Sequence, residues 1–190
     1  MTTTDQVSPR DRLLDAAAQL VYRDGVSVGV EALCRAAGVS KRSMYQLFGS
    51  KDEMLAASLQ RRLPWYDERF TPADPAARTP RERILYAFER LELASTEPEY
   101  HGCPYLAVLV ELKDPGHPAS QVARGAKERL AGVFRTQGEL GGARDPELLA
   151  RQLMLVFDGA SARSGARVER LDDGLATATA TALLDAAGMK

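Results

Sequence analysis

The chain of 190 residues carries 25 Lys and Arg against 26 Asp and Glu, and 45% of its residues are hydrophobic. An apolar fraction of this size is ordinary for globular proteins and excludes a disordered chain, and the length suits one domain or two small ones. The formal net charge of −1 excludes a strongly basic tail. Any contact with nucleic acid therefore has to use a local basic patch.

The cysteine and histidine content limits the chemistry that the chain can carry. Cys34 and Cys103 are its two cysteines, and it has two histidines. This is too few for a disulfide framework, and no zinc-ligand spacing is present, so a reducing compartment without a metal site is expected. Residues 1–7 lack the apolar core of a signal peptide, and the longest strictly apolar run, 105–110, is far short of the roughly 20 residues of a membrane span. We expect a soluble, cytoplasmic protein.

Helix start signals recur along the chain and strand signals are scarce, which predicts an all-α fold. Ser8-Pro9 and Thr79-Pro80 each place a side-chain acceptor before a proline at the first helical position, and a capping box follows the second of them. Asp114-Pro115 and Asp145-Pro146 indicate two further helix starts. The expected helices cover about residues 9–24, 30–37, 41–48, 50–62, 80–95, 104–112, 115–137, 146–163 and 174–187.

The two short helices at 30–37 and 41–48 are separated by Gly38-Val39-Ser40, and such a pair predicts a helix-turn-helix. Small and apolar residues of the first helix can pack against Met44 and Phe48 of the second, and Cys34 is assigned to this core. Between residues 33 and 62 the chain has six basic and two acidic residues. This local excess of positive charge suits a DNA backbone.

The second helix of this pair exposes side chains with the chemistry to bind a duplex. Lys and Arg reach phosphates or guanine edges, Ser and Tyr donate to phosphates, and Gln pairs with adenine. Lys51 lies in the first turn of the next helix, where free N–H groups attract a phosphate. We predict DNA contacts from Ser40, Lys41, Arg42, Ser43, Tyr45, Gln46 and Lys51.

Residues 28–55 read VGVEALCRAAGVSKRSMYQLFGSKDEML. Together with the helix before them, they closely resemble the DNA-binding domain of the TetR family of transcriptional regulators, through the pattern AAGVS, YxxF and SK. The resemblance covers about residues 9–60. It implies that residues 41–46 read DNA, that Tyr45 contacts a phosphate and that Lys51 holds the DNA backbone.

The resemblance also implies a two-domain plan, with a three-helix DNA-binding domain at 1–62 and a helical ligand-binding and dimerisation domain at 63–190. Helices 146–163 and 174–187 would form a four-helix dimer interface with their copies. Pockets between helices are apolar with a few polar groups. The candidate pocket residues are Trp65, Tyr86, Tyr100, His101, Cys103, Tyr105, Phe157 and Asp158.

The segment His101-Gly102-Cys103-Pro104 admits an enzyme hypothesis, because a thiolate is stabilised at the start of a helix. No nucleophile elbow, phosphate loop or metal motif accompanies it, so no catalytic residue, metal or cofactor is assigned. The expected function is that of a ligand-responsive transcriptional regulator, and we expect it to act as a repressor. It would bind a palindromic operator as a homodimer and leave it when a small-molecule effector binds. The alternatives are a DNA-binding module without effector control and a cysteine-dependent enzyme.

Overall fold

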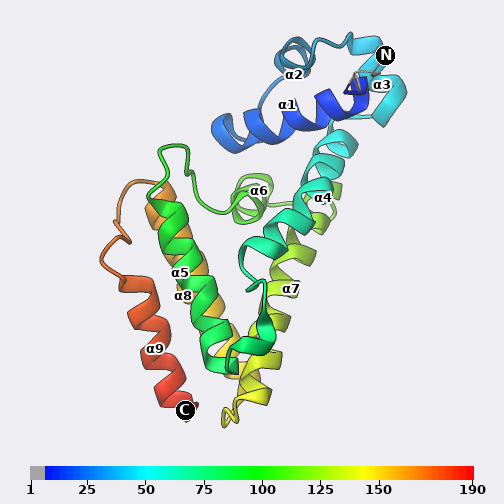
Figure 1. The fold of residues 1–190 in the computed structure, drawn as a ribbon. Helices are drawn as coiled ribbons and strands as arrows, with labels where there is room; N and C mark the ends of the chain where they lie inside the picture. The colour runs from blue at the N-terminus through cyan, green and yellow to red at the C-terminus, as the bar shows by residue number, and fades with distance from the viewer. Residues whose placement is uncertain (1–6) are drawn as a thin grey trace, which may run out of the picture. The chain divides into compact units, whose positions relative to one another are not determined.

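The computed structural model describes residues 7–190 (Figure 1), and over this range the chain forms nine α-helices, one 3-10 helix and no β-strand. The all-α prediction is confirmed. Most of the polar segment 1–7, and the start of the predicted domain 1–62, lie outside the described residues. The elements are α1 (Pro9–Asp24), α2 (Val30–Ala37), α3 (Lys41–Phe48), α4 (Lys51–Arg69), η1 (Pro75–Ala77), α5 (Pro80–Ser95), α6 (Pro104–Leu112), α7 (Pro118–Leu140), α8 (Pro146–Gly165) and α9 (Leu175–Ala187).

The chain divides into two compact units. The first ends at Arg62 and also includes Val108–Arg124, while the second comprises Leu63–Ala107 and Gly125–Lys190. Helices α4, α6 and α7 therefore contribute residues to both units.

The first unit packs α1, α2 and α3 around an apolar core in which Leu13, Leu33 and Met44 are at most 1% exposed. The turn between α2 and α3 depends on Gly38, whose φ of 61° and ψ of 38° are left-handed and strained for any residue with a Cβ. Ser40 then caps α3, because its side chain accepts a hydrogen bond from the backbone N–H of Ser43 at 3.1 Å. The predicted helix-turn-helix is therefore present, with its predicted core.

Charged side chains hold the turn that joins α1 to α2. The carboxylate of Glu111, near the end of α6, accepts a hydrogen bond from the N–H of Val26 at 2.7 Å. The ammonium of Lys51 donates to the carbonyl oxygen of Val26, also at 2.7 Å. Just before α7, His117 Nε2 lies 3.4 Å from the carboxylate of Asp52. These contacts explain why the end of α6 and the start of α7 belong to the first unit.

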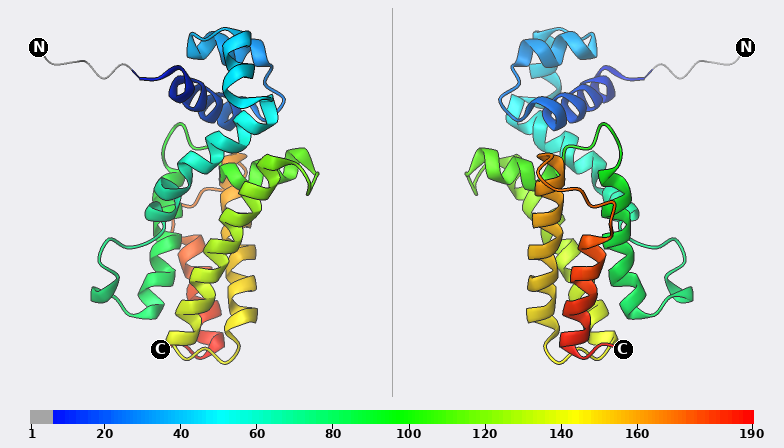
Figure 2. Two further views of the ribbon diagram at one scale, coloured as in Figure 1. Left: turned by 90° about the vertical axis from the view of Figure 1, so that its right-hand side faces the viewer. Right: turned by 90° about the vertical axis from the view of Figure 1, so that its left-hand side faces the viewer.

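The second unit contains α5, α8 and α9, which contact one another and run side by side (Figure 2). Phe88 of α5 stacks on Phe134 of α7 with ring centres 5.7 Å apart, and Phe157 of α8 meets Phe88 edge to face. Tyr66 continues the aromatic core with Phe70 and Tyr105 as edge-to-face neighbours. These rings supply the main apolar volume of the unit.

A backbone contact places the turn before α6 against α8. A Cβ built on Gly165 would lie 2.5 Å from both the backbone N of Gly102 and the carbonyl C of His101. Gly102 itself has a φ of 92°, a left-handed value. Only a residue without a side chain permits this approach at 165, and the approach sets where α6 begins.

Two predicted helix boundaries are wrong. The helix expected to end at 62 continues to Arg69 through Pro64. A proline disfavours a helix interior, but the buried side chains of Leu63 and Tyr66 hold this stretch against the core. The helix expected from 115 begins at Pro118. Asp114 does not cap it, because its carboxylate accepts the N–H of Gly116 at 2.8 Å and closes a turn instead.

Candidate functional site

Helix α3 presents a polar face to solvent above a buried apolar face. Met44 and Phe48 are 0% and 7% exposed, whereas Tyr45 is 48% exposed. Lys41, Arg42, Tyr45 and Gln46 are exposed, Ser43 is half-buried, and Ser40 is exposed at the N-cap. The helix therefore displays a row of hydrogen-bond donors that suit the acceptor atoms in a duplex groove.

The two lysines at and after α3 have different partners within the chain. Lys41 Nζ lies 2.5 Å from a carboxylate oxygen of Glu31 on α2, which raises the pKa of Lys41 and lowers that of Glu31. Both side chains are more than half exposed, so this pair is weak and can exchange for a phosphate. Lys51, in contrast, is half-buried and engaged with the Val26 carbonyl. Its ammonium has to leave that carbonyl, or share it, to meet a DNA backbone.

Two arginines of α1 support this face and were not predicted from the sequence. Arg12 donates from Nε to the carbonyl oxygen of Ala37 at 2.9 Å, which satisfies the last turn of α2. The guanidinium of Arg10 lies over the ring of Phe48, 5.2 Å from its centre. Both occupy the first turn of a helix, where a basic residue opposes the helix dipole, and that misfit is the signal that could have revealed them.

A cluster of polar side chains lies in the aromatic core of the second unit. The hydroxyl of Tyr66 is 3.2 Å from Cys103 Sγ, and Lys127 Nζ is 4.0 Å from the same sulfur. Lys127 also forms an ion pair with Asp158. The burial of Tyr66, and then the charge and hydrogen bond of Cys103, raise the pKa of the phenol well above its ordinary value of 10.0. We call Tyr66, Cys103, Lys127 and Asp158 the thiol cluster.

The structure brings four of the eight predicted pocket residues together at the thiol cluster. Cys103 and Asp158 belong to it, Tyr105 packs on Tyr66 with ring centres 4.7 Å apart, and the ring centre of Phe157 is 5.3 Å from Lys127 Nζ. Tyr100 is also buried, with its hydroxyl 2.9 Å from Ser161 Oγ.

The other three predicted pocket residues lie elsewhere. Trp65 is 54% exposed, with the guanidinium of Arg69 over its ring. Tyr86 is half-buried beneath Arg78, and His101 is exposed.

Tyr66 and Lys127 were absent from the predicted pocket. Its neighbour Trp65 was chosen in place of Tyr66, because the sequence does not show which of two adjacent aromatic residues faces the core. Lys127 had a signal in the sequence, since it follows Ala119, Ala123 and Ala126 on the buried face of α7. A lysine beside an apolar helix stripe needs a partner, and such a residue is a functional candidate.

A cavity of about 410 Å³ opens beside the thiol cluster. Its volume falls within the range of roughly 300–1,000 Å³ typical of small-molecule sites. Arg129 and Asp67 form an ion pair in its lining, with Nε and Oδ2 3.2 Å apart. None of the eight predicted pocket residues lines it. The lining residues are Tyr66, Asp67, Phe70, Thr71, Arg129, Leu130, Gly132, Val133, Thr136 and Gln137.

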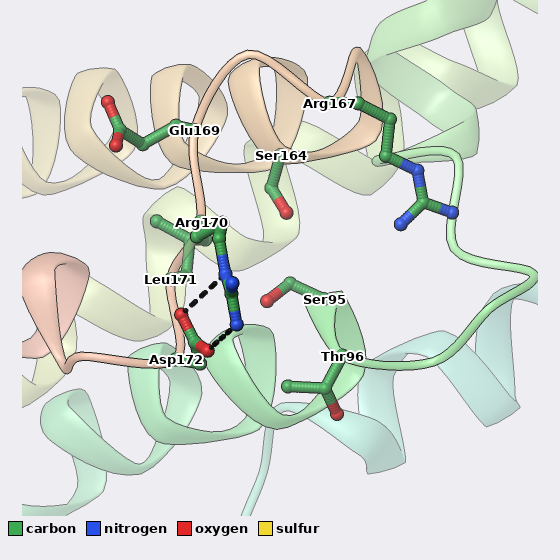
Figure 3. A pocket seen from close by; sticks show the side chains of 8 residues that line it. All are labelled: Ser95, Thr96, Ser164, Arg167, Glu169, Arg170, Leu171 and Asp172. Atoms are coloured by element: carbon green, nitrogen blue, oxygen red, sulfur yellow. Dashed lines mark hydrogen bonds and ion pairs between the residues drawn. The ribbon is translucent and has the colours of Figure 1, made fainter.

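A second cavity, of about 280 Å³, lies between the end of α5 and the segment from α8 to α9 (Figure 3). Arg170 and Asp172 form an ion pair there, and Arg167 donates to the carbonyl oxygen of Pro98 at 2.7 Å. The charges of this cavity are therefore largely satisfied within the chain. Its lining is Ser95, Thr96, Ser164, Arg167, Glu169, Arg170, Leu171 and Asp172.

Similarity to known proteins identifies the family of this chain. The profile of the "Bacterial regulatory proteins, tetR family" matches residues 13–58. A solved structure assigned to the TetR transcriptional regulators, from Streptomyces avermitilis, is 61% identical with a TM-score of 0.93, over 96% of this chain and 100% of that one. The chain belongs to the TetR family of transcriptional regulators. The resemblance inferred from the sequence is confirmed.

More distant relatives of this TetR-family protein agree with the assignment. The HTH-type transcriptional regulator BetI of Rhizobium meliloti is 36% identical over 76 residues, which is 40% of this chain and 37% of BetI. The chain thus aligns with little more than a third of the curated relatives. A TetR-family regulator from Streptomyces coelicolor is 22% identical with a TM-score of 0.77, over 94% of this chain and 93% of that one, and shows the fold alone.

Family and fold together make this protein a DNA-binding transcriptional regulator. Both the family and the fold are those of transcriptional regulators. No helix within residues 7–190 combines the length and apolarity that crossing a bilayer requires. Over the same range, His, Cys, Asp and Glu form no group of three that could hold a metal ion.

Proposed function

We propose that this TetR-family protein is a ligand-responsive repressor that binds a palindromic operator as a homodimer and releases it when a small molecule occupies the second unit. The exposed polar face of α3 above a closed apolar core carries the proposal. A single α3 offers few base contacts, and two-fold symmetry doubles them. Such a regulator works on chromosomal DNA, so we place it in the cytoplasm.

On the DNA side, α3 enters the major groove. Arg42 and Gln46 are the exposed side chains suited to guanine and adenine edges, whereas Tyr45 and Lys41 suit phosphates. The hydroxyls of Ser40 and Ser43 lie 2.9 Å apart at the helix N-terminus and can donate to a phosphate there. Lys51 reaches the backbone by giving up its bond to Val26.

The dimer uses the outer faces of α8 and α9. Leu148 and Leu155 of α8 lie two turns apart and are 47% and 76% exposed, and Leu175 at the start of α9 is 45% exposed. Exposed leucines on one helix face favour burial against a second copy. Within the small-residue stripe of α9, Ala176 and Ala180 pack inside the chain, so Ala178 and Ala182 remain available outside.

The effector occupies the cavity beside the thiol cluster. Its walls include the apolar side chains of Phe70, Leu130 and Val133, and Arg129 and Gln137 add polar groups. This composition suits a small, mainly apolar molecule that carries a hydrogen-bond acceptor.

Helix α6 is the element that carries the response. Its first turn holds Tyr105 next to Tyr66, and its last turn holds Glu111, which binds the N–H of Val26. A displacement of α6 would therefore move the turn before α2 and change the separation of the two reading helices. Couplings of about 1–3 kcal/mol, common in allosteric proteins, change DNA affinity by roughly 5–150-fold.

The experiment is the selection of bound duplexes from random DNA by the full-length protein, followed by titration of the selected operator at several salt concentrations. We expect a palindromic sequence and an affinity that falls linearly with salt on logarithmic axes. Lys51→Ala should weaken binding to all sequences and reduce the salt slope by about one, whereas Gln46→Ala should change the preferred base. Lys190→Ala removes a charge in the second unit and serves as the matched control. Recovery of no sequence, or an unchanged preference in Gln46→Ala, would refute the DNA assignment.

Effector control is tested separately by a thermal-shift screen of small molecules. A ligand of the folded state raises the melting temperature, and the same ligand should weaken operator binding. Ligands that bind without changing operator affinity would support the alternative, a DNA-binding module without effector control.

A further inference from the structure

The thiol of Cys103 is a nucleophile that the DNA-binding face does not use. It forms no disulfide and is 6% exposed. The phenol of Tyr66 and the ammonium group of Lys127 both lie near it. The other thiol, Cys34, lies among Leu33, Met44 and further apolar residues of the first unit, where burial raises its pKa. The two cysteines thus differ in their surroundings within one chain.

The charge next to Cys103 is unusual for a protein core. Lys127 is 9% exposed, and burying a lysine is costly even when it is paired, as here with Asp158. An apolar residue at 127 would pack against Phe157 without that penalty. A charge buried at such a penalty is a candidate for a functional site.

The thiol cluster also adjoins a space that a small molecule can enter. Tyr66 lines the cavity of about 410 Å³ and at the same time contacts Cys103 Sγ with its hydroxyl. Leu130, one turn after Lys127 on α7, lines the same cavity. Rotation of the Tyr66 side chain would connect the cavity to the sulfur.

We infer that Cys103 is a covalent modification site for soft carbon electrophiles, specifically α,β-unsaturated carbonyl compounds, which enter through the cavity at Tyr66. This inference rests on the proposed function in one respect, namely that the adduct is the effector that releases DNA. Sγ attacks the β-carbon and forms a C–S bond, while the π electrons of the double bond move to the carbonyl oxygen as an enolate. The thiol proton finally resides on the α-carbon, so no oxidant and no leaving group is required.

The neighbours of Cys103 suit this addition. The enolate oxygen carries negative charge during the reaction, and hydrogen-bond donors placed around it lower the barrier. Tyr66 stays a donor because burial holds the pKa of its phenol high. Lys127 offers a second donor, and the aromatic rings of Tyr105 and Phe157 surround the carbon skeleton. Tyr66 and Lys127 are therefore positioning residues for the modification.

The test uses the full-length protein with 2-cyclohexen-1-one, and saturated cyclohexanone as the matched compound that cannot add. Peptide mapping by mass spectrometry gives the alkylation rate of each cysteine in the same sample. We expect Cys103 to react at least about tenfold faster than Cys34, which serves as the internal control. Equal rates, or a faster Cys34, would overturn the inference.

Variants of the positioning residues separate a reactive site from a merely accessible thiol. Tyr66→Phe, and the double variant Lys127→Met with Asp158→Asn, should slow the reaction of Cys103 by about tenfold and leave Cys34 unchanged. The double variant removes both charges, so neither is left unpaired in the core. Folding is checked by circular dichroism. If folded variants react as fast as the wild type, Tyr66 and Lys127 do not assist the reaction and the site is refuted.

Operator binding supplies the last measurement. The enone, but not cyclohexanone, should weaken DNA binding at least about fivefold, a coupling at the lower end of the usual range. Cys103→Ser should still bind DNA and resist the enone. Modification of Cys103 without DNA release would overturn the effector role. A protein that binds no operator would refute the proposed function, while the alkylation rates still decide on the modification site.

Discussion

The contact of Gly165 with the turn before α6 gives a sharp prediction for stability. In Gly165→Ala the new Cβ would lie 2.5 Å from the N of Gly102 and the C of His101, and 2.6 Å from the carbonyl oxygen of His101. All three are backbone atoms, so no flexible side chain can move aside and the turn itself has to shift. Overpacking of this kind costs about 1–3 kcal/mol. For a chain of this size that lowers the melting temperature by roughly 2–12 °C.

The matched control is Gly125→Ala in α7, where the nearest atom to a new Cβ is the end of the Arg129 side chain at 3.7 Å. Alanine is the better helix former, so this variant should gain about 0.5–1 kcal/mol. Both variants are compared with the wild type by differential scanning calorimetry at one protein concentration. A Gly165→Ala protein that melts at the wild-type temperature, or a Gly125→Ala protein destabilised as much, would refute the packing argument.

Three further predictions concern the proposed dimer, a helix cap and the hydrogen bond between Val26 and Glu111 of α6. Leu155→Glu should raise the dissociation constant of a two-fold dimer by roughly 10²–10⁴-fold, since about 1.5–3 kcal/mol is lost in each subunit. Light scattering should then show monomers, whereas the control Leu93→Glu on α5 should stay dimeric. Hydrogen bonds from Thr79 lower the pKa of Glu82 below its ordinary 4.5, so this contribution to stability is present above that pH and lost as the pH falls through the lowered pKa. In Glu82→Gln the melting temperature should therefore fall less as the pH is lowered into the acidic range. A dependence on pH equal to that of the wild type would contradict the cap assignment. Glu111→Ala removes the acceptor of the Val26 N–H and should speed hydrogen exchange of that amide about five- to tenfold, and unchanged exchange would show that the contact is not formed in solution.

The helix-turn-helix was predictable because its determinants are local. Gly38 closes one helix, Ser40 caps the next, and the alternation of buried and exposed residues around Met44 fixes which face is polar. Each of these effects acts within one or two turns of chain. Helix starts at Ser8, Thr79 and Asp145 followed from the same short-range chemistry.

The arrangement of the candidate pocket residues was harder to predict, because residues that meet in the second unit are distant in the sequence. Cys103, Tyr105, Phe157 and Asp158 were chosen as aromatic or polar residues on apolar stretches, and the structure gathers them. Trp65 satisfied the same criterion and lies on the surface, since composition does not reveal which way a side chain points.

By itself, the sequence determined the all-α class and helix α3 with its polar face, because capping, glycine conformation and the 3.6-residue period operate within short stretches of chain. Tertiary structure alone decided that Lys127 meets Cys103 and Asp158, that Glu111 binds Val26, and that α8 requires a glycine at 165. Those contacts join residues between 24 and 85 positions apart, and their formation depends on how whole helices pack.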